Sequence, residues 1–301
     1  MYQFTLSVPR LTNWQAYRWR IKQSSQQAFF ICREESVGRI LNVRGKARYV
    51  EVSPDPQEQA RWQVTVYGGS RQDEGELVRL LRRIFSLGTD LESFYSQCGD
   101  DPTLAVPISR LAGARMLCDA DVFACALSTV ISQQVNLSFA GELKRRLWRL
   151  AGVPVAVGAE VYYADPLPEA VARLDYADLQ ALQFTRRKAE YIIDFARSVA
   201  GGSFDLDSLN QLDDQAAMDK LCSVRGFGPW TAECILLFGL GRPDLLPAKD
   251  VGLQRAVTRV LGRSQRIGEQ ELRQLAATWR PWRSWATYYL WLALSLPEFQ
   301  R

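Results

Sequence analysis

Residues 221–257 constrain the fold of this chain more than any other stretch. They predict a helix that ends near Val224, a tight turn with the sequence RGFG, and a second helix that begins at Pro229. Two glycines one residue apart allow positive φ and let the backbone approach another molecule closely. Proline suits the first position of a helix, where its missing N–H has no intrahelical partner to lose. The free amide groups at such a helix start form an anion site, and phosphate is the anion that we expect there.

A short loop after the second helix leads to Asp250, which stands directly before another helical run. Taken alone, an aspartate in this place is most often an N-cap. A glycine turn between two helices most often only connects them. The joint occurrence of the two features at this distance is more specific than either one.

The whole segment resembles the helix-hairpin-helix DNA glycosylases, whose pattern L-x-x-[VI]-x-G-[IVF]-G-x-W-T-A is followed by a catalytic aspartate. The matching residues are Leu221, Val224, Gly226, Phe227, Gly228, Trp230, Thr231, Ala232 and Asp250. The resemblance implies that Asp250 is catalytic. It also implies that the hairpin residues hold DNA phosphates through the backbone, with or without a bound metal ion; these residues are Arg225, Gly226, Phe227 and Gly228.

A single carboxylate suits the cleavage of an N-glycosidic bond. The reaction passes through a sugar that carries positive charge, which a carboxylate in a largely dry pocket stabilises far better than one in water. The same group can position or deprotonate the attacking water. Bifunctional members of the superfamily carry a lysine where Trp230 stands, so the resemblance implies a monofunctional enzyme that leaves an abasic site. We expect Lys249, beside Asp250, to meet a phosphate or solvent.

Composition excludes several other kinds of chemistry. The chain has 301 residues, of which 47% are hydrophobic and 23% charged, as in an ordinary globular protein. No apolar run approaches the roughly 20 residues of a membrane span, and the N-terminus shows no secretory signal pattern. Histidine is absent, which removes histidine triads and the common zinc sites.

The six cysteines include no C-x-x-C pair, and we interpret them as reduced thiols of a cytoplasmic protein. The resemblance implies that this protein acts on the bacterial nucleoid. No cysteine follows Cys234, which excludes the iron–sulfur cluster that some members of the superfamily hold. We expect no cofactor and no set of metal ligands.

The distribution of charge is compatible with a DNA partner. The net charge of +4 is modest, but nine lysines or arginines face four acidic residues from Lys249 to the end of the chain. Further basic clusters occupy residues 144–146 and 186–188. A basic face suits phosphate contacts, although solvated helix faces often carry arginine as well.

Two further stretches match the bacterial 3-methyladenine DNA glycosylase II group. In the first, STVISQQVN at residues 128–136, Gln134 matches the side chain that this group inserts into the duplex where the damaged nucleotide leaves the stack. We assign Gln133 to the same DNA contact. The alternative is that Gln133 and Asn136 cap helices.

The second stretch, WRPWRSWATYYLW at residues 279–291, is mostly core by its composition. The group, however, uses a tryptophan that matches Trp291, together with one that matches Trp230, to wall the base pocket. Stacked aromatic faces attract a cationic alkylated purine by about 1–2 kcal/mol when desolvated. Cys234 stands where the known pocket has a tyrosine, so we expect a wider or less aromatic pocket and leave the recognised lesion open.

These observations predict an α+β fold. We expect an N-terminal antiparallel sheet with covering helices at residues 1–99, with β structure alone up to about residue 75. A helical domain with the helix-hairpin-helix is expected at residues 120–240, and a second helical lobe at residues 100–119 and 241–301. Residues 152–165 are interpreted as a loop. The base pocket should lie between the two helical lobes, with Asp250 on one wall and Trp230 opposite.

The predicted function is hydrolysis of the N-glycosidic bond of damaged, alkylated bases such as 3-methyladenine, flipped out of double-stranded DNA by a monomeric enzyme. The first alternative is a glycosylase for 8-oxoguanine, a class that normally requires the lysine that Trp230 replaces. The second is a non-catalytic helix-hairpin-helix protein that only binds DNA.

Overall fold

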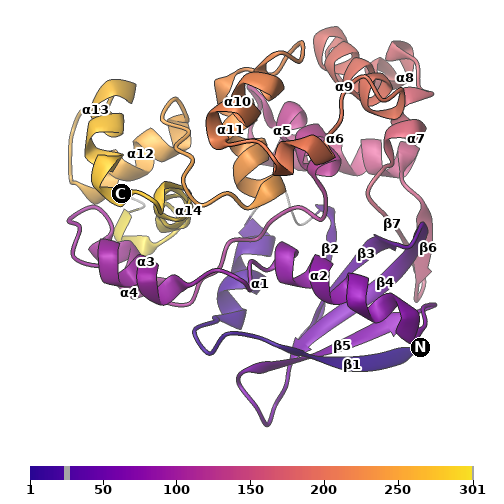
Figure 1. The fold of residues 1–301 in the computed structure, drawn as a ribbon, viewed down its shortest axis with the longest axis horizontal. Coiled ribbons are helices and arrows are strands. Elements are labelled where there is room, and N and C mark those ends of the chain that lie inside the picture. Colours follow the sequence, from indigo (N-terminus) through magenta and orange to yellow (C-terminus); the bar gives the residue numbers. More distant parts are fainter. Residues whose placement is uncertain (24–27, 300–301) are drawn as a thin grey trace.

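The computed structural model of the protein describes residues 1–23 and 28–299, and begins with a five-stranded antiparallel sheet (Figure 1). Its strand order is β1-β5-β4-β3-β2, so β1 pairs with β5, the last of the five strands along the chain. The strands are β1 (Tyr2–Ser7), β2 (Phe30–Cys32), β3 (Val37–Val43), β4 (Lys46–Pro54) and β5 (Arg61–Tyr67). Each lies in an apolar or alternating stretch of the kind that predicts a strand.

The rest of the described chain is mainly helical, as predicted. The helices are α1 (Trp14–Gln23), α2 (Glu74–Ile84), α3 (Leu91–Cys98), α4 (Ala105–Arg110), α5 (Val122–Ser132), α6 (Leu137–Ala151), α7 (Pro168–Ala172), α8 (Tyr176–Ala181), α9 (Arg186–Ala200), α10 (Asp214–Cys222), α11 (Pro229–Cys234), α12 (Val251–Val260), α13 (Glu269–Leu275) and α14 (Arg283–Ala293). A π-helical turn, Ile235–Gly239, continues α11. None of the described helices is both long enough and apolar enough to cross a bilayer.

The expectation of β structure alone up to residue 75 is wrong at α1. Trp14, Tyr17 and Ile21 are its buried residues and lie on one helical face. The Tyr17 ring meets the Trp62 ring of β5 edge to face, with 5.7 Å between centroids. Aromatic residues are common in strands as well as in helices, so only the contact with the sheet decides that these ones belong to a helix.

The interpretation of residues 152–165 as a loop is also wrong. They contain a two-stranded hairpin of β6 (Pro154–Val157) and β7 (Glu160–Tyr163). Val157 pairs with Glu160 across a two-residue turn, in which Gly158 has a φ of 65°. Positive φ at a glycine in such a turn is typical of tight hairpins. Each strand has only four residues, which is too short for a clear alternating pattern.

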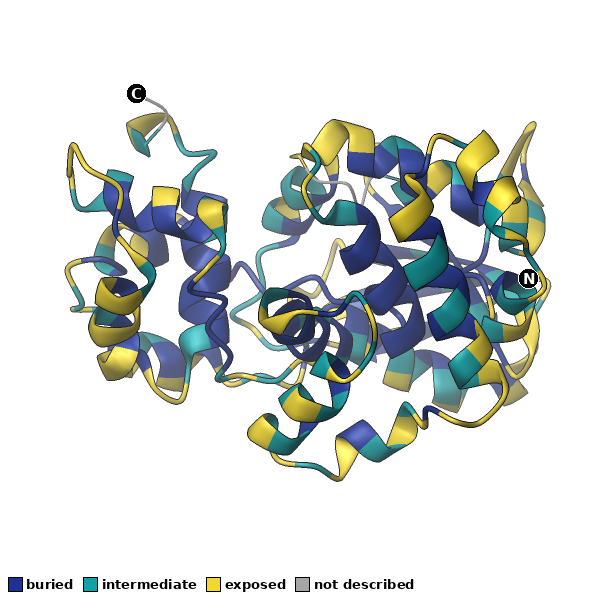
Figure 2. Ribbon diagram, turned by 90° about the horizontal axis from the view of Figure 1, so that it is seen from above, coloured by how far each residue is buried: buried dark blue, intermediate teal, exposed yellow. Residues whose placement is uncertain are grey.

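The described chain forms a large body and a smaller C-terminal lobe (Figure 2). In the smaller lobe, α14 packs against α4 and α12. Helix α3 packs against this lobe, because the centroid of the Phe94 ring lies 5.4 Å from that of the Tyr289 ring of α14. Just after α3, Asp101 accepts a hydrogen bond from the Trp279 indole. The division of the chain into three parts stays a prediction, and these contacts favour counting α3 with the C-terminal lobe.

A buried ion pair ties the sheet to the helical body. Arg39 of β3 donates to both carboxylate oxygens of Asp165, at 3.0 and 2.9 Å. Trp148 of α6 donates its indole N–H to the same carboxylate at 2.8 Å. Arg39 and Asp165 are only 4% exposed each. A buried charge loses its hydration and therefore depends on its partner.

We expect Asp165→Ala to lower the free energy of unfolding by about 3–5 kcal/mol, because it leaves the Arg39 guanidinium buried without its carboxylate. Urea unfolding followed by circular dichroism measures this loss. Asp100→Ala, at an exposed position, is the control and should change stability by less than about 0.5 kcal/mol. Equal stability of the two variants would contradict this account of the ion pair.

Candidate active site

The hairpin between α10 and α11 has the tight geometry that its glycines predict. Gly226 has a φ of 91°, and a Cβ atom built there would lie 2.3 Å from the Tyr191 ring of α9. Both the backbone conformation and the close approach therefore require glycine. Phe227 points inward, with its ring 4.8 Å from the Phe195 ring. The hairpin is thus anchored on α9, with Gly228 exposed at the start of α11.

Asp250 is the N-cap of α12 and accepts three N–H hydrogen bonds. Its Oδ1 accepts from the Leu253 amide at 2.6 Å and from the Trp291 indole at 2.9 Å. Its Oδ2 accepts from the Trp230 indole at 3.0 Å. Trp230 therefore lies directly against the carboxylate and does not form a wall opposite to it, which corrects the expected arrangement. An ionised carboxylate has about four acceptor sites, so three donors still leave room for a water molecule.

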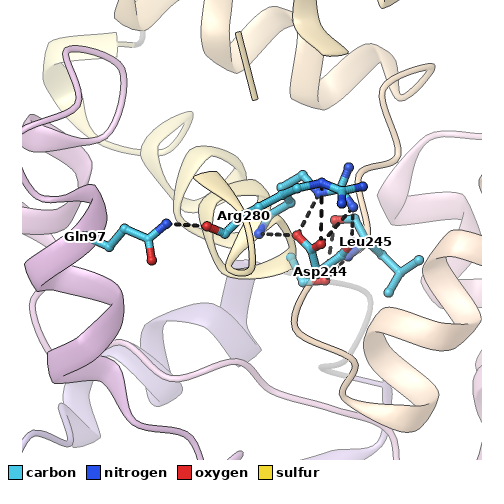
Figure 3. Close-up of polar contacts among 6 residues, drawn as sticks. Gln97, Asp244, Leu245 and Arg280 are labelled. Atoms are coloured by element: carbon cyan, nitrogen blue, oxygen red, sulfur yellow. Dashed lines mark hydrogen bonds and ion pairs between the residues drawn. The ribbon is translucent and has the colours of Figure 1, made fainter. Parts of the chain in front are cut away.

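The loop that leads to Asp250 is fixed to the start of α14 (Figure 3). Arg283 donates to both carboxylate oxygens of Asp244, at 2.7 and 2.9 Å, and to its carbonyl oxygen at 2.7 Å. Arg280 forms a longer ion pair of 3.8 Å with Asp244, and its carbonyl oxygen accepts a hydrogen bond from Gln97 of α3. Arg283 therefore anchors the loop in front of Asp250.

The turn between α5 and α6 lies beside the hairpin. Gln133 donates its side-chain amide to the Gly226 carbonyl and to the Thr231 hydroxyl, both at 3.0 Å. Lys188 of α9 donates to the carbonyl oxygens of Ile131 and Gln133, both at 2.7 Å. Gln133 therefore joins the turn to the hairpin, whereas the DNA contact expected of it stays a prediction.

Gln134 is the exposed tip of this turn and has a φ of 54°, a conformation that is strained for a residue other than glycine. Asn136 caps α6 by accepting from the Phe139 amide at 2.8 Å, as the alternative assignment of the amides predicts. The turn therefore presents Gln134 outward on a fixed base.

The two cationic site candidates are both ion-paired. Arg225 donates to Glu190 at 2.7 Å and stacks over the Tyr191 ring at 5.5 Å. The Lys249 ammonium lies 3.8 Å from a carboxylate oxygen of Glu269, and its side chain is 61% exposed. Arg225 is exposed in the hairpin, and Lys249 is exposed beside Asp250. Each side chain has to leave its carboxylate partner in order to bind a phosphate.

An open groove of about 820 Å³ brings these elements together. The residues that line it include Gln133, Gln134, Asn136, Gly226, Gly228, Trp230, Lys249 and Asp250. The hairpin, the turn after α5 and the Lys249–Asp250 segment therefore border one surface, although they are far apart in the chain. Arg225 and Phe227, which were also predicted to touch DNA, are not among the residues that line it.

A second cavity, of about 140 Å³, lies on the other side of Trp230. Cys234 and Phe238 line it. The base-pocket role of Cys234 stays a prediction, and the sequence analysis did not single out Phe238. Trp291 does not border this cavity, but its ring stacks on Phe238 at 5.7 Å and 17°. Phe238 follows Cys234 by one helical turn, so the spacing from Trp230 is the sequence signal that could have identified it.

Glu233 of α11 is an unexpected buried acid beneath the hairpin. Glu233 is 6% exposed, and a guanidinium nitrogen of Arg273 lies 3.8 Å from one of its carboxylate oxygens. Burial raises the pKa of Glu233 to about 7, although the positive charge of Arg273 opposes the rise. The Glu233 carboxyl group, in the second helix of the helix-hairpin-helix, therefore ionises near neutral pH.

Comparisons with known proteins agree with this geometry. Residues 127–281 match the family of HhH-GPD superfamily base excision DNA repair proteins. The DNA-3-methyladenine glycosylase of Bacillus subtilis (strain 168) is 33% identical over 219 residues, which cover 73% of this chain and 72% of that protein.

Solved structures show the same fold. The 3-methyladenine DNA glycosylase from Archaeoglobus fulgidus superimposes with a TM-score of 0.85 at 23% identity, covering 98% of both chains. The 8-oxoguanine glycosylase/lyase of Clostridium acetobutylicum, in complex with double-stranded DNA, has a TM-score of 0.71 at 20% identity, covering 88% of this chain and 87% of that one.

We expect Glu233→Gln to stabilise the protein at high pH only. Because the folded-state pKa of about 7 lies above the ordinary value of 4.5, the stability that the protonated acid confers is complete below pH 4.5 and is lost as the pH rises through 7. The variant should therefore match the wild type near pH 4 and exceed it at pH 8.5, by at most about 3 kcal/mol. Urea unfolding at both pH values measures the difference.

Glu92→Gln, at an exposed position of α3, is the matched control and should show the same difference from the wild type at both pH values. A pH-independent effect of Glu233→Gln would contradict the burial of an ionisable acid at this place.

Proposed function

Because the chain belongs to the HhH-GPD superfamily of base excision DNA repair proteins, we propose that it is a DNA glycosylase that hydrolyses the N-glycosidic bond of alkylated bases, such as 3-methyladenine, in double-stranded DNA. The observation that carries the proposal is the Asp250 carboxylate, which two indole N–H groups and a backbone amide hold at the edge of the groove. The name of the Bacillus subtilis relative favours alkylated adenine as the base class.

Asp250 is the catalytic residue in this proposal. Its charge faces the sugar of the flipped nucleotide and stabilises the positive charge that develops as the bond to the base breaks. A water molecule on a remaining lone pair of the carboxylate is placed to attack the sugar, and Asp250 takes up its proton. Trp230 and Trp291 keep the carboxylate oriented, so little reorganisation is needed when charge appears.

The product is an abasic site on an intact strand. Trp230 occupies the position at which bifunctional glycosylases carry their nucleophilic lysine, and an indole nitrogen cannot attack the sugar. Lys249 is ion-paired with Glu269, and its side chain is 61% exposed. An 8-oxoguanine glycosylase/lyase function is therefore the less favoured of the two enzymatic functions, even though such an enzyme shares the fold.

The hairpin and the turn bind the DNA in this proposal. Backbone amides of Gly226 and Gly228 contact phosphates on one side of the lesion, and Arg225 supplies charge beside them. Gln134 occupies the gap that the flipped nucleotide leaves in the duplex. We further propose that the protein acts as a monomer in the cytoplasm, on the bacterial nucleoid.

We expect Asp250→Asn to lower the rate of base release by at least about a hundredfold, since the amide is neutral and cannot stabilise the charged sugar. High-performance liquid chromatography of bases released from methylated duplex DNA under single-turnover conditions measures the rate. Asp90→Asn alters an N-cap carboxylate of the same kind at α3, outside the groove, and should leave the rate unchanged.

Wild-type protein that binds DNA but releases no base would favour the purely DNA-binding alternative. With wild-type protein, the strand should break only after alkali, because no lysine attacks the sugar. Strand breakage without alkali would assign a lyase function to Lys249.

We expect Gln134→Gly to separate stability from activity. Glycine relieves the positive φ at this turn, so the free energy of unfolding should rise by up to about 1 kcal/mol. Base release should fall, and the fall should be larger when the lesion has a pairing partner than when it lies opposite an abasic site. Gln183→Gly relieves a φ of 69° outside the groove but also removes the hydrogen bond that Gln183 accepts from Arg146, and it should leave the rate of base release unchanged. An unchanged rate in Gln134→Gly would remove Gln134 from the flipping step.

A further inference from the structure

The cavity behind Trp230 has a polar floor that the cleavage mechanism does not use. Residues of α5, α6 and α11 line it, and α5 packs against both α6 and α11. Trp230, Phe29 and Phe238 give it aromatic walls, whereas Ser128, Asp119 and the cations Lys144 and Arg20 are among its polar lining residues. An aromatic cavity with a few converging polar groups is typical of a small-molecule site.

Exposure decreases from the mouth of the cavity to its floor. Leu137, beside the turn that carries Gln134, is 61% exposed, whereas Ser128 is 6% and Asp119 and Lys144 are 5% exposed each. A purine joined to its sugar through N9 enters such a cavity with its opposite edge first. The edge that carries the exocyclic groups at C6 and C2 therefore meets the buried polar residues.

Ser128 supplies an independent sign of a ligand. Its hydroxyl is buried, and it has no hydrogen-bond partner within the described part of the chain. A buried hydroxyl without a partner is unfavourable by about 1–3 kcal/mol, so it is retained more readily where a ligand satisfies it. Ser128 is about as deeply buried as Asp119 and Lys144, which line the same cavity.

Asp119 supplies the acceptor. Burial raises the pKa of Asp119, and the positive charges of Arg39 and Lys144 oppose that rise. In either protonation state the carboxyl group keeps an oxygen that accepts a hydrogen bond. An acceptor at this place favours a base with an amino group at C6, as in adenine, and disfavours one with a carbonyl oxygen there, as in hypoxanthine.

We propose that this cavity holds the flipped base and that Asp119 and Ser128 select adenine-type bases by hydrogen-bonding the exocyclic amino group at C6. The inference rests on the proposed glycosylase function and deepens it. Selection then depends on hydrogen bonds at the cavity floor as well as on stacking against Trp230 and Phe238. Asp119 and Ser128 are specificity-determining residues, and neither takes part in the cleavage step.

The test compares release of 3-methyladenine from methylated duplex DNA with release of hypoxanthine from a defined duplex, both under single-turnover conditions. Ser128→Ala should lower release of 3-methyladenine about three- to tenfold, because the amino group at C6 loses a hydrogen-bond partner. The Ser128 hydroxyl can also donate to a carbonyl oxygen, so the preference between the two bases is tested at Asp119. Asp119→Asn presents an N–H donor to the cavity, so the hypoxanthine to 3-methyladenine ratio should rise at least tenfold.

The control is Tyr2→Phe, which removes another buried hydroxyl without a partner in the described residues, on β1 and away from the cavity. It should leave both rates unchanged. Ser128→Ala removes no described hydrogen bond of the hydroxyl and should fold normally, so the inference stays testable if Asp119→Asn does not fold.

The outcomes separate the two proposals. Normal wild-type release of 3-methyladenine, with an unchanged rate in Ser128→Ala or an unchanged ratio of the two rates in folded Asp119→Asn, would overturn the selection by the cavity floor and leave the glycosylase function standing. Wild-type protein that releases no base from any of these DNAs would overturn both.

Discussion

The contact between Asp250 and the two indole N–H groups is the interaction on which the arrangement of the helical parts depends. Trp230 comes from the hairpin helix, Asp250 from the start of α12, and Trp291 from the end of α14. A charge-assisted hydrogen bond is shorter and stronger than a neutral one, and here two such bonds converge on one carboxylate between two helical bodies. The interaction that joins the bodies therefore also fixes the orientation of the reactive group.

The DNA-facing surface is built by a second set of polar contacts. Gln133 joins the turn after α5 to the hairpin, and Lys188 satisfies the carbonyl oxygens at the end of α5. These bonds hold Gln134 in a strained conformation at the surface. Strain at an exposed tip persists only where its surroundings are rigid, and the hairpin, the turn and α9 provide that rigidity together. The groove is thus shaped before any DNA binds.

Two neighbouring sites divide the work in the functional proposals. The groove with Asp250 acts on the sugar, and the cavity behind Trp230 receives the base. The Trp230 indole borders both and so separates the carboxylate that acts in cleavage from the polar groups that act in selection. A change of specificity in this architecture can therefore occur at Ser128 or Asp119 without a change at the cleaving group.

The sequence by itself determined the five strands, most helices, the hairpin with its required glycine at position 226, the family and the position of Asp250, because these depend on local periodicity and on backbone conformations that few residue types adopt. It did not determine α1 or the hairpin of β6 and β7, whose short apolar patterns suit more than one structure. Only the tertiary structure placed Trp230 against Asp250, gave Arg283 its partner Asp244, and brought Ser128, Asp119 and Lys144 to one cavity. Such contacts join residues far apart in the chain, and their geometry follows from the packing of whole helices, which no local pattern of residues encodes.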